Sequence, residues 1–154
     1  WAYNPLVKTY DYSPERATEL IKNFPKEAGE LKVTLTTLPT YLQTAEKIAS
    51  YWQAVGIKTE VNVAAVPPQE FQALLAIHEI PLDPDQYSIW HSTQDISNIT
   101  NYKSPRIDKL LEDGRKELDQ NKRKEIYLDF QRFLVEDSPV IFLSHPAVFT
   151  ITRK

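Results

Sequence analysis

Over residues 31–64 the spacing of apolar residues changes from that of a strand to that of a helix and back again. This pattern constrains the fold more than any other feature of the chain. Apolar and polar residues alternate over residues 31–38, as they do in a half-buried strand. Over residues 41–55 apolar residues recur every three or four positions, which predicts an amphipathic helix, and Gly56 follows where a left-handed residue would end it. Residues 57–64 alternate again. Because a strand, a helix and a strand with short connections form a right-handed crossover, we predict an α/β fold with a mostly parallel sheet flanked by helices.

The last third of the chain, residues 104–143, is predicted to form two helices and a buried strand. Ser104-Pro105 is typical of a helix N-cap and first turn, and apolar residues as far as Leu118 then fall on one side of the first helix. The second helix is expected to end at Ser138-Pro139. The apolar run at 140–143 has the length of a buried strand.

Shorter segments complete the predicted organisation. A helix opens at Ser13-Pro14, and another is predicted from Pro67-Pro68 to Leu75. Residues 1–12 are expected to be an extended, ordered arm. Residues 147–152 are a second candidate for a strand at the end of the sheet.

Residues 78–103 have no sustained period and are predicted to form a long loop that faces a cleft. Ordered connections of this length are usually functional, and the aromatic residues Tyr87, Trp90 and Tyr102 argue against disorder. Ligands of open α/β sheets bind outside the carboxyl ends of the strands, where such loops emerge. Two interpretations of Trp90 stay open: it fills the core, or it forms a wall on which a ligand stacks.

Composition excludes several classes of function. The 154 residues suffice for one domain with a sizeable core, since 42% of them are hydrophobic. The net charge of -3 argues against nucleic acid or an anionic membrane surface as a partner, because both favour clustered Lys and Arg. Absence of cysteine removes disulfides, thiolate metal sites and cysteine nucleophiles. The sequence begins at Trp1 and contains no methionine, so we expect a processed product or an excised piece of a longer protein.

We predict no catalytic, metal or cofactor site. The three glycines lie too far apart for a phosphate-binding loop, and no Gly-x-Ser-x-Gly elbow is present. The three histidines lack metal-binding spacing. Asp83-Pro84-Asp85 lacks the glycine and further acidic ligands of a calcium loop, and is interpreted as a rigid acidic turn or as a turn that faces the cleft. The basic residues 122–124 are interpreted as a solvated helix face, with a transporter-docking surface as the alternative.

Several motifs of the last third occur together and point to a known family. They are Asn-Tyr from residue 101, Pro-x-Ile-Asp-Lys-Leu-Leu from 105, Lys-Arg-Lys-Glu-Ile-Tyr from 122 and Glu-Asp-Ser-Pro-Val-Ile-Phe-Leu from 136. With DYSPERATELI and AEKIASYWQAVGIKTEV upstream, the chain resembles the C-terminal lobe of the extracellular solute-binding proteins that serve oligopeptide and dipeptide ABC importers.

The resemblance implies that residues 1–154 are a single lobe of the periplasmic-binding-protein type II kind, within a longer two-lobe protein. Such a protein is not an enzyme and has no cofactor. The implied partners are a peptide or other small solute, the N-terminal lobe of the same protein and an ABC permease, with no nucleic acid. The implied location is the outer face of the membrane or the periplasm, and the implied signal sequence, of the lipoprotein type, lies outside this stretch.

Two departures from the family pattern lie close to Ile80. In the family, a turn and a central strand follow the helix predicted to end at Leu75, whereas here the loop begins almost at once. Either that strand is deleted or a segment is absent from this sequence, and the second is favoured because losing a central strand would expose its neighbours' ladder edges. In the family's peptide binders, an aspartate three residues before the position of Asp83 pairs with the peptide's α-ammonium. Ile80 occupies that position here, and the adjacent Glu79 is a candidate substitute.

The candidate ligand-binding residues are six positions of one segment: Glu79, Asp83, Tyr87, Trp90, Asn101 and Tyr102. Two other functions stay open. The chain could be a stand-alone module whose aromatic arm and loop bind a protein, or a lobe for a non-peptide solute such as an oligosaccharide or a nickel complex.

Overall fold

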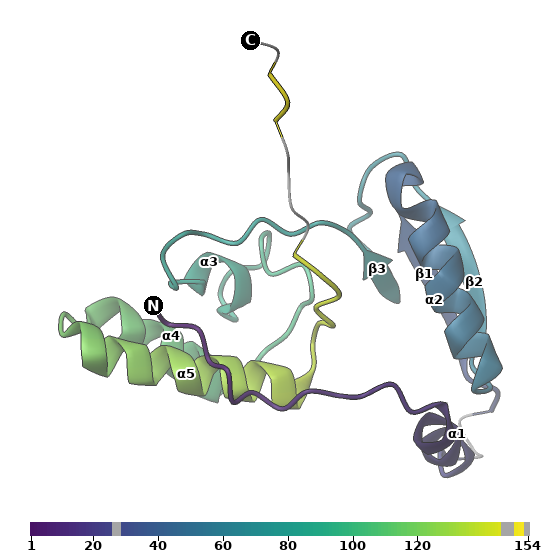
Figure 1. The fold of residues 1–154 in the computed structure, drawn as a ribbon, viewed down its shortest axis with the longest axis horizontal. Helices are drawn as coiled ribbons and strands as arrows, with labels where there is room; N and C mark the ends of the chain where they lie inside the picture. Colours follow the sequence, from purple (N-terminus) through teal and green to yellow (C-terminus); the bar gives the residue numbers. More distant parts are fainter. Residues whose placement is uncertain (26–28, 146–149, 153–154) are drawn as a thin grey trace. The chain divides into compact units, whose positions relative to one another are not determined.

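The computed structural model describes residues 1–25, 29–145 and 150–152, and it divides the chain into two units. We call Tyr10–Ile80 the sheet unit, and Trp1–Thr9 with Pro81–Lys154 the helical unit. Each unit is described by itself. Figure 1 labels the helices and strands of both.

The sheet unit contains a three-stranded sheet in which every pair of strands is parallel. The strands are β1 (Lys32–Thr37), β2 (Lys58–Val63) and β3 (Ala73–Leu75), in the order β2-β1-β3. A 3-10 turn, η2 (Pro39–Tyr41), leads into the helix α2 (Leu42–Ala54), which packs on β1 and β2 (Figure 1). The predicted strand, helix and strand at residues 31–64 are therefore confirmed, and so is the parallel sheet.

Small residues allow α2 to lie close to the sheet. Ala45 and Ala49 are its buried residues, and Leu35 of β1 is also buried. Gly56 has a φ of 99°, which is the left-handed conformation that favours glycine, and it turns the chain from α2 into β2. The Gln53 side-chain amide donates to the carbonyl of Thr59 (2.9 Å), which ties the end of α2 to β2.

The helix predicted from Pro67-Pro68 to Leu75 is wrong, because Ala73–Leu75 form β3 instead. Three consecutive apolar residues carry no period, so strand and helix could not be distinguished there. A short third strand thus follows β2, and residues 64–72 between β2 and β3 form no helix.

The register of the strands explains why residues 64–72 can connect β2 to β3 without a helix. Val63 at the end of β2 lies level with Thr37, and Ala73 at the start of β3 lies level with Leu35. The start of β3 is therefore only two residues back from the end of β2, as measured along β1. A connection that had to return along the whole length of a long parallel strand would need about a dozen residues or more.

The predicted first helix is confirmed as α1 (Pro14–Lys22). Ser13 is its N-cap, and its hydroxyl accepts from the backbone N–H of Arg16 (3.4 Å). The helix has no buried residue, and Leu20 is 64% exposed. Its contribution to the sheet unit is consequently small.

The helical unit consists of α3 (Tyr87–Trp90), α4 (Pro105–Lys116) and α5 (Gln120–Asp137), and α4 and α5 lie side by side (Figure 1). Both long helices were predicted. Their core contains seven buried residues: Ala2, Trp90, Ile107, Leu111, Tyr127, Phe130 and Leu134. The inward position predicted for Leu118 is wrong, since α4 ends two residues earlier and Leu118 is 95% exposed in the turn.

The N-terminal arm runs along α5 in the helical unit (Figure 1). Ala2 and Asn4 are buried there. The Gln131 side-chain amide donates to the carbonyl of Ala2 (2.6 Å), and its oxygen accepts from the backbone N–H of Asn4 (3.0 Å). Hydrogen bonds to α5 therefore order the arm, which has no helix or strand of its own.

The strand predicted at 140–143 is wrong. Within the described residues this run belongs to no strand, and Ile141, Phe142 and Leu143 are each more than half exposed. An apolar run indicates a preference for burial, yet a strand also needs a neighbour for its backbone groups. The second predicted strand, at 147–152, lies mostly outside the described residues.

Candidate ligand-binding segment

The segment predicted to face a ligand, residues 78–103, is irregular except for the single helical turn α3. The division of the chain falls within it, between Ile80 and Pro81. Glu79 therefore belongs to the sheet unit, where it is exposed beyond the carboxyl end of β3. The other five candidates belong to the helical unit.

Asp83 is held by an arginine of α5. The Arg123 guanidinium donates two hydrogen bonds to the Asp83 carboxylate (2.6 and 3.0 Å), and the backbone N–H of Asp85 donates a third (2.9 Å). The Arg123 hydrogen bonds lower the pKa of Asp83. The Asp83 carboxylate thus already has hydrogen-bond donors within the protein, from Arg123 and from the backbone of Asp85.

Asp85 fixes the other end of the same turn. It accepts from the Arg115 side chain of α4 (2.7 Å) and from the backbone N–H of Tyr87 at the start of α3 (3.0 Å). These contacts support the rigid acidic turn rather than a turn open to ligand. No cluster of three or more potential metal ligands occurs among the described side chains.

Tyr87 lies in a stack of three side chains. The His91 ring is parallel to it, with 4.0 Å between centroids, and the Arg115 guanidinium lies 4.1 Å from its centroid. Two groups this close to one ring centroid must take opposite faces. Tyr87 is only half-buried, but both faces of its ring are covered.

Trp90 lies in the core of the helical unit and is 4% exposed. Its indole N–H donates to the Gln86 side chain (2.8 Å), so its polar atom is satisfied within the protein. Of the two interpretations of Trp90, the geometry supports packing. A stacking role for Trp90 stays a prediction, because the sequence showed an aromatic residue but not the neighbours that cover it.

Asn101 and Tyr102 end the segment. Asn101 is exposed and has a φ of 51°, a left-handed conformation that asparagine tolerates better than most residues. The Tyr102 hydroxyl donates to Asp137 of α5, and burial together with this carboxylate raises the pKa of Tyr102. Asn101 is therefore the more accessible of the two.

Two residues that order this segment were not singled out from the sequence. Asn98 is buried, and its amide donates to the carbonyl of Tyr102 (2.7 Å). Asp108 of α4 accepts from both the backbone N–H (2.8 Å) and the hydroxyl of Ser92. Asn and Ser in an irregular segment, and Asp in a first helical turn, are the signal that could have revealed them, because these residues often bond to nearby backbone.

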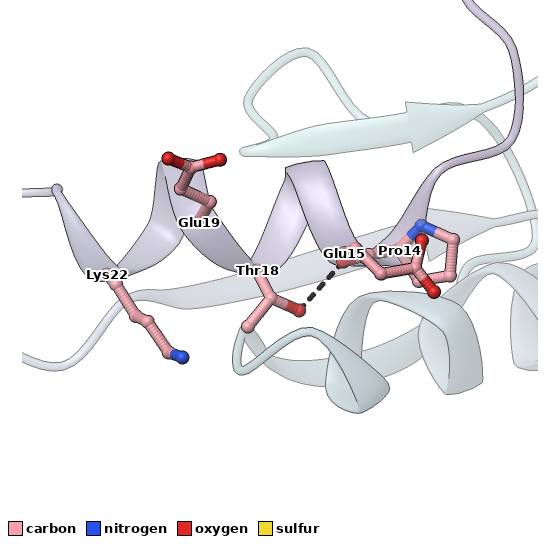
Figure 2. Close-up of a pocket in the computed structure, with 5 residues that line it drawn as sticks. All are labelled: Pro14, Glu15, Thr18, Glu19 and Lys22. Atoms are coloured by element: carbon pink, nitrogen blue, oxygen red, sulfur yellow. Dashed lines mark hydrogen bonds between the residues drawn. The ribbon is translucent and has the colours of Figure 1, made fainter.

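Two surface hollows are lined by none of the candidate residues. One, of about 430 Å³, runs along α1 and is lined by Pro14, Glu15, Thr18, Glu19 and Lys22 (Figure 2). Thr18 donates to the carbonyl of Pro14 (2.8 Å), and the charged ends of Glu19 and Lys22 point to opposite sides of the helix (Figure 2). The other is lined by residues 93–97. Because the charged groups around α1 do not converge, we assign it no ligand.

The described part of the chain contains no helix that combines the length and the apolar character needed to cross a membrane. No protein-family model matches the chain. The sequence is nevertheless similar to several proteins of known name. The chain is 27% identical to di/tripeptide-binding protein 1 of Pseudomonas aeruginosa, in an alignment that covers all of this chain and 32% of the relative. That alignment runs over 175 positions, so the relative carries residues without a counterpart in this chain of 154 residues.

Solved structures of the same kind share the fold. NikZ from Campylobacter jejuni, in complex with Ni(L-His), has a TM-score of 0.81 at 23% identity, with 90% of this chain and 33% of that chain covered. The periplasmic binding protein DppA from Helicobacter pylori, in complex with the peptide STSA, has a TM-score of 0.77 at 26% identity, with 90% and 30% covered.

The chain thus spans about a third of the length of the proteins it matches. The family resemblance and the fold class predicted from the sequence are both confirmed. The homologues of this chain are the dipeptide- and oligopeptide-binding proteins of ABC importers, and the chain shares with them a parallel sheet flanked by helices.

Proposed function

We propose that this chain is the C-terminal lobe of a peptide-binding protein that delivers its ligand to an ABC permease. The observation that carries the proposal is homology over the whole chain to proteins named for binding di- and tripeptides. The lobe performs no chemistry on the peptide. It acts at the outer face of the membrane or in the periplasm, as the names of the relatives suggest.

Binding depends on two lobes. Each lobe supplies one side of a cleft, and the closed form is favoured because the ligand contacts both sides only when the lobes close. One lobe alone leaves most of a small peptide in water, whereas binding sites bury most of their ligand. This chain by itself is consequently a weak binder.

Glu79 is the residue of this chain that we propose to contact the peptide's α-ammonium. It is exposed and follows β3, and ligands of parallel sheets bind beyond the carboxyl ends of the strands. Its neighbour Ile80 cannot pair with a cation. Asn101 and the partly buried Tyr87 and Tyr102 are further proposed contacts. Asp83 and Trp90 are proposed to support the segment through their partners Arg123 and Gln86.

The decisive experiment identifies the ligand that co-purifies with the full-length protein, by mass spectrometry under native conditions. We expect short peptides. Recovery of a metal complex or an oligosaccharide instead would overturn the peptide assignment while leaving the binding role intact.

Calorimetry on the full-length protein then tests Glu79. Glu79→Gln is expected to weaken binding of the recovered peptide by about tenfold or more, because a hydrogen bond to a charged group is lost. Glu70→Gln is a matched control, since Glu70 is also exposed in the sheet unit. Equal affinities for both variants would remove Glu79 from the site.

A further inference from the structure

His91 is a buried titratable residue for which the proposed function has no role. It caps the end of α3, and only 4% of it is exposed. One ring nitrogen, Nε2, is fully buried and makes no hydrogen bond. Buried polar atoms are normally satisfied, so an exception in a native fold calls for a reason.

The contacts of the other ring nitrogen identify the neutral form of the ring. The backbone N–H of Thr93 donates to Nδ1 (3.3 Å), which requires Nδ1 to be free of a proton. The Thr93 hydroxyl lies 2.8 Å from the same nitrogen. In a neutral ring the proton is therefore on Nε2, and it points toward Glu112, whose Oε1 lies 3.5 Å away, beyond ordinary hydrogen-bond distance.

The charged side chains named here around the ring belong to α4. Glu112 of α4 is the carboxylate that faces Nε2, and its other oxygen lies 3.8 Å from the Lys116 amine. Arg115 of α4 is separated from His91 by the Tyr87 ring of α3. Asp108 of α4 is occupied by both hydrogen-bond donors of Ser92. A proton on His91 would thus face the Glu112 carboxylate, and the Tyr87 ring would separate it from Arg115.

We propose that His91 is a proton-operated latch, which fixes Thr93 through Nδ1 when the ring is neutral and releases the Thr93 backbone when the ring takes up a proton. The proton adds to Nδ1, which then donates to the Thr93 hydroxyl instead of accepting from the Thr93 N–H. The positive ring gains Glu112 as its partner at Nε2. Residues 93–97 line a surface hollow, so the shape of that hollow changes with pH.

The test follows the Thr93 amide by ¹H–¹⁵N NMR in the full-length protein between pH 8 and pH 5. We expect one transition of the amide signal and faster hydrogen exchange of this amide on the acid side. A Thr93 amide signal that stays constant over this range would overturn the latch.

Variants assign the transition to the His91 and Glu112 pair. Glu112→Gln is expected to move its midpoint to lower pH, because the carboxylate that faces Nε2 of the charged ring is lost. Asp113→Asn is the matched control, since Asp113 is on the same helix but pairs with Lys109 (2.6 Å). Equal midpoints in the two variants would contradict the role of Glu112.

A third variant removes the titration and keeps the acceptor. Asparagine places a side-chain oxygen near the position of Nδ1 and carries no charge at any of these pH values. In His91→Asn the Thr93 amide signal is therefore expected to be constant with pH. A transition that persists in this variant would show that a group other than His91 causes it. The comparison of Glu112→Gln with Asp113→Asn changes partly exposed residues, so it remains a test even if His91→Asn does not fold.

Discussion

The sheet unit and the helical unit bury different kinds of side chain. In the helical unit the buried side chains include the large Trp90, Tyr127, Phe130 and Ile107, besides the small Ala2 and the polar Asn4, His91 and Asn98. Among the described residues of the sheet unit the buried ones are smaller or polar: Leu35, Thr36, Thr37, Ala45, Ala49 and Thr59. The comparison teaches that side-chain packing stabilises the helical unit, whereas the sheet unit depends more on the hydrogen bonds of its parallel strands.

The largest expected effect is the removal of a core ring from the helical unit. Phe130→Ala leaves a cavity beside Tyr127, whose ring meets Phe130 edge-on with 6.4 Å between centroids. We expect a loss of about 3 to 5 kcal/mol in the free energy of unfolding, measured by urea denaturation and by amide exchange in α4 and α5. Leu35→Ala in the sheet unit should cost less, and a larger cost for Leu35 would reverse the comparison.

The next effect tests how closely the two long helices pack. A Cβ atom on Gly114 of α4 would lie 2.8 Å from Cζ of Tyr127, which is too close for two carbon atoms. Gly114→Ala is expected to cost about 1 to 2 kcal/mol even after the helix propensity that alanine adds. Lys116→Ala, at an exposed position of the same helix, should change unfolding by less than about 0.5 kcal/mol.

A second substitution sharpens this prediction. Tyr127→Leu removes the ring that the new Cβ would meet, so adding Gly114→Ala to it should cost less than it does in the wild-type background. Additive effects of the two substitutions would contradict a direct contact.

Helix N-caps offer a smaller comparison between the units. The Asp119 carboxylate accepts from the backbone N–H groups of Asn121 and Lys122 (both 3.0 Å) at the start of α5. Asp119→Ala should therefore cost about 1 kcal/mol in thermal or urea unfolding. Ser13→Ala, at the cap of the poorly buried α1, should cost less and appear as fraying of α1 in NMR. The reverse order would mean that α1 matters more to its unit than its exposure indicates.

The smallest effect concerns the ion pair between Asp83 and Arg123. Because the pKa of Asp83 is lowered in the folded state, its contribution is present above the pKa of an unfolded aspartate and is lost as pH falls through the folded pKa. Asp83 is more than half exposed, so Asp83→Asn should cost only about 0.5 kcal/mol at pH 7. The difference from wild type should disappear near pH 2, and a difference independent of pH would assign the effect to something other than the charge.

The candidate site was predicted from the sequence only in outline. The long segment, its aromatic residues and the family were all visible as patterns. The partners of Asp83 and Trp90 were not, because Arg123 lies 40 residues further along the chain and the packing around Trp90 comes from α4 and α5. A residue type indicates which interactions a side chain can make, but not whether a neighbour within the protein already makes them.

Local patterns were enough to place β1, α2, β2, α1, α4 and α5, because each has a clear period or a recognisable cap within its own residues. The three residues of β3 and the apolar run at 140–143 had no such signal. In both, an apolar run becomes a strand only if its backbone pairs with a strand that is distant in the sequence. Ala73 of β3 pairs with Leu35 of the neighbouring strand β1, while residues 140–143 pair with no strand among the described residues. Secondary structure whose hydrogen bonds close within a few residues can be inferred from sequence, and secondary structure that depends on a distant backbone cannot.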